Sequence, residues 1–62
     1  MTPYALVIKT MREVANGDGE FSYNAYLVKV STPAIAVSNL RVAINERLIK
    51  HHPLKKGWYI IL

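Results

Sequence analysis

The stretch from Thr32 to His52, TPAIAVSNLRVAINERLIKHH, constrains the fold most, because no other segment has so long and regular a helical pattern. Pro33 suits a first helical position, since its φ is preset and it lacks an N–H that would have no partner there. Thr32 is a suitable N-cap, a role that the preceding serine also fits. Pro53 keeps the residue before it out of the α region. The sequence therefore predicts one helix that begins at Pro33 and ends near Lys50 or the histidine after it.

Two apolar stripes run along this predicted helix. At 100° per residue, the first stripe is a narrow core face made of Val37, Leu40, Ile44 and Leu48. The second stripe lies roughly 140° around the helix by the same geometry. It consists of Ile35, Val42 and Ile49. A helix that covers one face of a sheet needs a single stripe, so we expect the second to contact a partner.

Three further segments are rich in β-branched and aromatic residues and are typical of strands: Tyr4–Val14, Phe21–Val30 and Trp58–Leu62. The run Ala15–Glu20 separates the first two and contains Asn-Gly and Asp-Gly, which are strong hairpin signals. The predicted fold class is α+β. A β-β-α-β chain would place a three-stranded antiparallel sheet, in the order 2-1-3, on one helix. Residues 1–62 are expected to form a single small domain, because the length leaves no room for a second.

The chain is unusually apolar for its size. Hydrophobic residues make up 52% of it and charged residues 19%, whereas a domain this small buries only about 60% of its unfolded surface. No cysteine is present to form a disulfide. In the predicted hairpin both sheet faces are apolar, and the last strand is an uncharged open edge. We therefore predict a homodimer whose interface uses Ile35, Val42, Ile49, Trp58, Ile60 and Leu62.

Two features of the sequence bear on location. No apolar run approaches the ~20 residues that a membrane-spanning helix requires. The N-terminal residues MTPYALVIKTM lack the basic region and the cleavage site of a signal peptide. The prediction is a cytoplasmic protein without a membrane partner.

No pattern typical of an enzyme is found. His51 and His52 are adjacent, so on a helix they point about 100° apart and do not converge on one metal ion. Zinc needs three or four ligands. The four acidic residues have no spacing suited to paired-carboxylate chemistry, and no serine or glycine motif for a nucleophile or a phosphate loop is present. We expect no catalytic residues, no cofactor and no metal.

The basic residues are the most informative polar feature. The net charge is +4, and the segment RLIKHHPLKK gathers Arg47, Lys50, Lys55 and Lys56. At a helix end and in the following loop, these four side chains would be able to contact phosphates of DNA or RNA. The alternative is that they stabilise the helix C-terminus and the solvated loop. Phe21 and Tyr23 could stack bases on an exposed sheet face, or be core residues instead.

No motif in the chain points to a named family, so two functional hypotheses remain. The first is a small, self-associating, non-enzymatic regulatory protein that binds nucleic acid through the basic helix end. The second is an inhibitor or adaptor, such as a bacteriophage accessory protein, that binds a heterologous protein. It would use the apolar edge Trp58–Leu62 or the second helix stripe.

Overall fold

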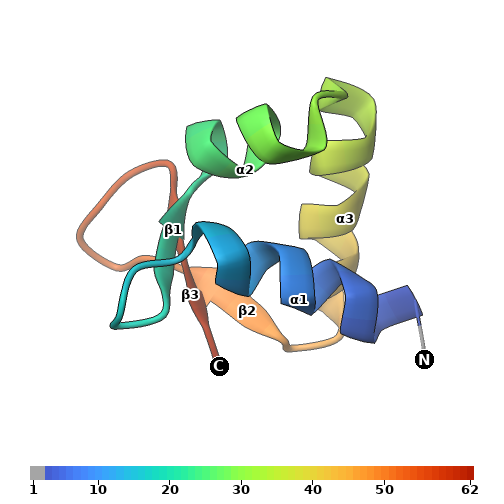
Figure 1. The fold of residues 1–62 in the computed structure, drawn as a ribbon. Helices are drawn as coiled ribbons and strands as arrows, with labels where there is room; N and C mark the ends of the chain where they lie inside the picture. The colour runs from blue at the N-terminus through green and yellow to red at the C-terminus, as the bar shows by residue number, and fades with distance from the viewer. Residues whose placement is uncertain (1–2) are drawn as a thin grey trace.

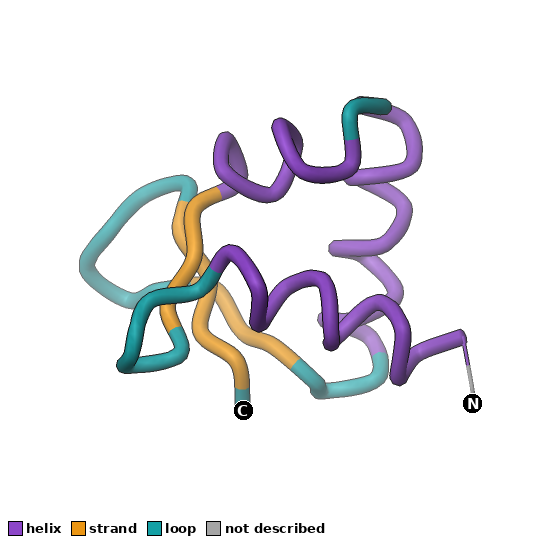
Figure 2. Tube along the Cα trace, viewed as in Figure 1, coloured by secondary structure: helices purple, strands orange, loops and turns teal. Residues whose placement is uncertain are grey.

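The computed structural model describes residues 3–62. The described chain contains three helices and three short strands (Figures 1 and 2). In order, they are α1 (Pro3–Val14), β1 (Glu20–Ser22), α2 (Tyr23–Val30), α3 (Pro33–Asn45), β2 (Ile49–His51) and β3 (Trp58–Ile61). The predicted mixed α+β class and the three-stranded antiparallel sheet are confirmed. The predicted single helix is wrong, since three helices are present.

The C-terminal strand β3 is the centre of the sheet. It pairs antiparallel with β1, where Phe21 faces Tyr59, and with β2, where Lys50 faces Ile60. The spatial order is therefore β1-β3-β2. The prediction that Trp58–Leu62 forms an open edge is wrong, because both sides of β3 are paired.

The predicted strand Tyr4–Val14 is instead helix α1, so that prediction is wrong. Its half-buried and buried apolar residues recur with the helical period, at positions 7, 8, 11 and 14. Met11 is fully buried, and the others pack around the same cluster. Side-chain packing along this stripe outweighs the β propensity of the valine and isoleucine residues.

The predicted strand Phe21–Val30 is also wrong beyond its first two residues, because helix α2 begins at Tyr23. Ser22 caps this helix, with its hydroxyl oxygen accepting a hydrogen bond from the Ala25 N–H at 3.1 Å. Ser31 ends it in the left-handed region, with φ of 68° and its N–H bonded to the carbonyl of Leu27. Two serines thus define a helix of eight residues.

Helix α3 begins as predicted, with Thr32 as N-cap and Pro33 at the first position, although the Thr32 side chain makes no capping hydrogen bond. It ends at Asn45, so the predicted end near Lys50 is wrong. Arg47 has a positive φ of 59°, which no continuing helix adopts. The chain therefore turns after α3 and reverses into β2.

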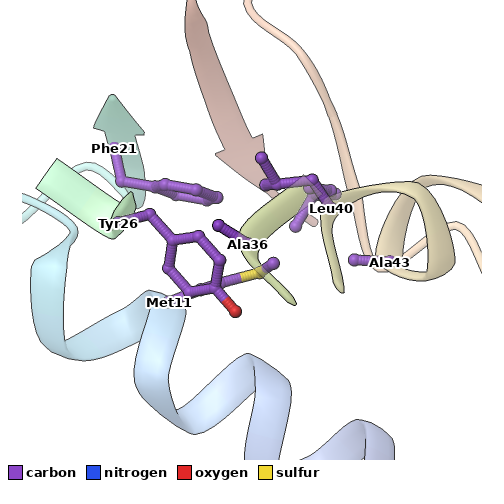
Figure 3. Packing of buried hydrophobic residues seen from close by; sticks show 7 residues of the cluster. Met11, Phe21, Tyr26, Ala36, Leu40 and Ala43 are labelled. Carbon is purple, nitrogen blue, oxygen red and sulfur yellow. The ribbon is translucent and has the colours of Figure 1, made fainter. Parts of the chain in front are cut away.

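The core lies between the three helices and the sheet (Figure 3). Phe21 and Tyr26 pack with ring centroids 6.0 Å apart, and Met11 lies against them. Ala36 and Ala43 are the residues of α3 with no exposed surface. Their small side chains let the backbone of α3 pack close to the other core residues. The fully or nearly fully buried residues are Met11, Phe21, Tyr26, Ala36, Leu40, Ala43 and Ile49.

The core face of α3 is therefore only partly the predicted stripe. Leu40 is buried, and Ile44 and Leu48 pack against the cluster, but Val37 is 41% exposed. Ile49 does not lie on a helix at all. It is 2% exposed in strand β2, so its predicted place on a spare helix stripe is wrong.

The turn predicted at Ala15–Glu20 is present, but it joins α1 to β1 instead of joining two strands. The Asn16 side-chain oxygen accepts hydrogen bonds from the N–H groups of Asp18 and Glu20, at 2.9 and 3.1 Å. Gly19 takes a φ of 78°, which glycine adopts without strain. None of the helices within residues 3–62 is long and apolar enough to cross a membrane.

Candidate nucleic-acid interface

Helix α3 presents a polar face to solvent. Residues Ser38, Arg41 and Asn45 follow the spacing i, i+3, i+7, so they fall within about 60° of one another around the helix. All three are exposed, and the opposite side of α3 is buried in the core. This face carries Arg41 as its single charge, because the segment from 33 to 45 contains no acidic residue.

These side chains have the chemistry that reads base edges. Arginine donates two parallel hydrogen bonds to guanine, asparagine bonds adenine through donor and acceptor together, and serine bonds several bases. Arg41 has no carboxylate partner among residues 3–62, so its guanidinium is available to a ligand. The major groove of B-DNA is wide enough to admit an exposed helix with such side chains.

The polar face of α3 borders the β2–β3 hairpin. A shallow hollow of about 280 Å³ lies between them, with Arg41 on one side and His51 and Tyr59 on the other. The Tyr59 ring stacks on Phe21 at 5.5 Å and contacts the His51 ring at 5.1 Å. Helix α3 and the hairpin therefore form one continuous surface.

The loop between β2 and β3, residues 52–57, is held by the His52 side chain, which is 6% exposed. Its Nε2 lies 2.9 Å from the Glu20 carboxylate on β1, and its Nδ1 lies 3.0 Å from the backbone nitrogens of Leu54 and Lys55. The ammonium of Lys55 contacts the same carboxylate at 3.3 Å and lies 4.7 Å from the Trp58 ring centroid. The hydrogen bond from His52, with help from Lys55, lowers the pKa of Glu20 below its usual 4.5 despite partial burial.

The four basic residues predicted to bind nucleic acid do not lie together at a helix end. Arg47 is in the turn after α3, Lys50 is on β2, and Lys55 and Lys56 are in the loop. All four are exposed. Lys55 differs from the others because Glu20 already neutralises it. Within the described part of the chain, the other three have no ion-pair partner.

The six residues predicted to form the dimer interface differ in their exposure to solvent. Ile35 and Leu62 are 52% and 63% exposed, whereas Ile49 belongs to the core. Val42, Trp58 and Ile60 are half-buried. A second surface hollow of about 650 Å³ lies elsewhere, beside α1, and is lined by Tyr4, Ala5, Ile8, Lys9, Arg12, Glu13 and Leu48.

The polar face of α3 was absent from the sequence predictions. Its signal is the helical spacing of Ser38, Arg41 and Asn45, which places three polar side chains on one side of a helix. The contact between Glu20 and His52 spans 32 positions in the chain, and no local pattern indicates it. Among residues 3–62 there is no group of three histidine, cysteine or acidic side chains able to hold a metal ion.

Comparison of the chain with protein-family models, with curated proteins and with solved structures finds no match.

Proposed function

We propose that this protein is a small regulatory protein that binds duplex DNA, with α3 in the major groove and exposed basic residues beyond α3 on the phosphates. The observation that supports it best is the exposed face of Ser38, Arg41 and Asn45 on a helix with no acidic residue. The proposal keeps the nucleic-acid hypothesis and moves its centre from the basic segment to α3.

The arrangement of α2 and α3 supports this choice. A two-residue turn joins them, and α3 runs away from α2 in a different direction (Figure 1). In DNA-binding helix-turn-helix units the second helix lies in the major groove. This likeness is an analogy of fold and carries no function by itself, so the side chains of α3 are what support DNA binding.

The basic residues would position the helix on the duplex. Arg47, Lys50 and Lys56 have no ion-pair partner among the residues described, so each can neutralise a phosphate. Phosphate contacts fix the register of a protein on DNA, while contacts to base edges select the sequence. Arg41, Ser38 and Asn45 would then carry the specificity.

Duplex DNA fits better than single strands or duplex RNA. Single-strand binding uses exposed aromatic rings as stacking platforms. Phe21 is fully buried here, which confirms the core position that the sequence allowed for it and leaves it unable to stack on bases. The major groove of duplex RNA is too deep and narrow for side chains to read, whereas that of B-DNA admits a helix.

The test is selection of duplexes from a random-sequence library, followed by fluorescence anisotropy with the best duplex. We expect Arg41→Gln to weaken binding to that duplex by about 1–3 kcal/mol, the value of one bidentate base contact. Arg12→Gln on α1 removes the same charge and is the matched control. Equal losses in both variants, or no binding at low salt, would contradict the proposal.

The protein-binding alternative has lost part of its support. Its edge strand is paired on both sides, and Ile49 of its helix stripe is buried. Self-association stays a prediction, and the apolar surface available for it includes the exposed side chains of Ile35 and Leu62 and the hollow beside α1. Light scattering at high protein concentration measures the oligomeric state directly.

A further inference from the structure

The loop that carries Lys55 and Lys56 has an internal support that the proposed function leaves unexplained. The carbonyl of Lys55 accepts a hydrogen bond from the Trp58 N–H at 3.2 Å, which closes a four-residue turn. Gly57 has a φ of 79° at the third position of this turn, the conformation that a type II turn requires. Lys56 therefore occupies the exposed corner of the turn.

The start of this turn is held by the His52 ring. Two backbone N–H groups, from Leu54 and Lys55, point at Nδ1 from 3.0 Å. A nitrogen that receives two donors must be the unprotonated one, so the ring proton lies on Nε2 and is donated to Glu20. The ring thus spans from β1 to the loop in one defined tautomer.

The charged groups around the ring favour this arrangement. The Glu20 carboxylate faces Nε2 from β1 and accepts a hydrogen bond from the Nε2–H group. Lys55 faces the same carboxylate from the loop and is 51% exposed in its side chain. The Lys55 ammonium also lies over the Trp58 ring. Lys55 is consequently paired within the protein, and Lys56 is the loop lysine left for an outside anion.

We propose that His52 is a positioning residue which, as the Nε2–H tautomer, holds the 52–57 loop so that Lys56 contacts a DNA phosphate. The role in DNA contact rests on the proposed function, whereas the positioning of the loop does not.

Two substitutions of His52 separate the bond that its ring makes to the loop from the bond that it makes to Glu20. The Asn16 side-chain oxygen accepts from the N–H two residues ahead, the same local bond that His52 Nδ1 makes with Leu54. His52→Asn therefore keeps an acceptor at the position of Nδ1 and gives up the contact to Glu20. His52→Gln places its amide at the position of Nε2 and gives up the acceptor for the loop.

Two measurements on the free protein test the positioning without DNA. Nitrogen-15 NMR of the wild-type His52 ring is expected to find the proton on Nε2. Hydrogen exchange is expected to find the Leu54 and Lys55 amides protected in the wild type and in His52→Asn, and unprotected in His52→Gln. A proton on Nδ1, or the same amide protection in both variants, would overturn the proposal.

Binding to the selected duplex tests the role of Lys56. We expect His52→Gln to weaken binding about eightfold at 0.1 M salt, the loss of one phosphate contact, and Lys56→Gln to have the same effect. His52→Asn should bind like the wild type.

Equal weakening in both His52 variants would overturn the positioning role, because loss of the Glu20 contact alone would then explain the weaker binding. Absence of DNA binding in the wild type, with protected amides, would refute the proposed function and the DNA role of Lys56 but not the loop positioning.

Discussion

The salt dependence of DNA binding can be predicted numerically from the exposed basic residues. Three cations that follow α3 in the chain are exposed and unpaired within residues 3–62: Arg47, Lys50 and Lys56. Three phosphate contacts predict a slope of log affinity against log salt of about −2.7. Affinity should therefore fall roughly 40-fold between about 50 and 200 mM salt by the same relation.

Single substitutions should change this slope in a residue-specific way. Lys56→Gln removes one contact, so the slope should become about −1.8 and the loss over the same salt range roughly 12-fold. Lys55→Gln should leave the slope near the wild-type value, because Glu20 already neutralises the Lys55 ammonium at 3.3 Å. Lys9→Gln on α1 is the control, since it changes the net charge by the same amount.

Fluorescence anisotropy titrations at four or more salt concentrations give the slopes. The reasoning is refuted when Lys9→Gln reduces the slope as much as Lys56→Gln does. That result would mean that the protein binds DNA through its overall positive charge. It is also refuted when Lys55→Gln has the larger effect, because the Glu20 pair would then not hold Lys55.

Three further predictions concern stability. Leu40→Ala should cost about 2–5 kcal/mol in urea denaturation, because Leu40 is 4% exposed in the core, whereas Ile35→Ala at a 52% exposed site should cost far less. Ser22→Ala should cost about 1 kcal/mol by the same assay, since it removes the cap of α2, and a cost near zero would contradict the capping role. The lowered pKa of Glu20 means that the unfolded chain binds more protons, so this contribution is complete above pH 4.5 and is lost as pH falls through the folded-state pKa. Acid unfolding of Glu20→Gln should accordingly show a weaker dependence on pH below 4.5, and an unchanged dependence would contradict the assignment.

Local signals in the sequence predicted the features that depend on nearby residues. Pro33 after Thr32 identified the start of α3, because proline conformation and capping act within one turn. The turn after Ala15 follows from Asn16 and glycine chemistry, which is equally local. The strand predicted at Trp58–Leu62 from its composition is present as Trp58–Ile61, although its central position was not predicted.

The errors arose where two periodic patterns fitted the same residues. Tyr4–Val14 contains enough valine and isoleucine for a strand, yet its apolar positions also follow a helix. The choice between them depends on packing against Phe21 and Tyr26, which lie outside this segment in the next two elements. Once these segments are helices, the C-terminal strand is free to pair on both sides, and the sheet order changes with it.

The candidate site was only partly predictable for the same reason. Its charges are visible in the sequence, but which of them are free depends on tertiary pairing. Glu20 and Lys55 are 35 positions apart, and only the folded sheet brings them together. The face of α3 that could contact base edges can be identified only when the buried face of the helix is known.

The most direct test of the central proposal is a nitrogen-15 NMR titration of the protein with its selected DNA duplex. Binding through α3 predicts the largest shift changes at Ser38, Arg41 and Asn45, with a further change at Lys56 in the loop. Changes confined to α1, around Ile8 and Arg12, would contradict the proposal that α3 is the DNA-binding helix.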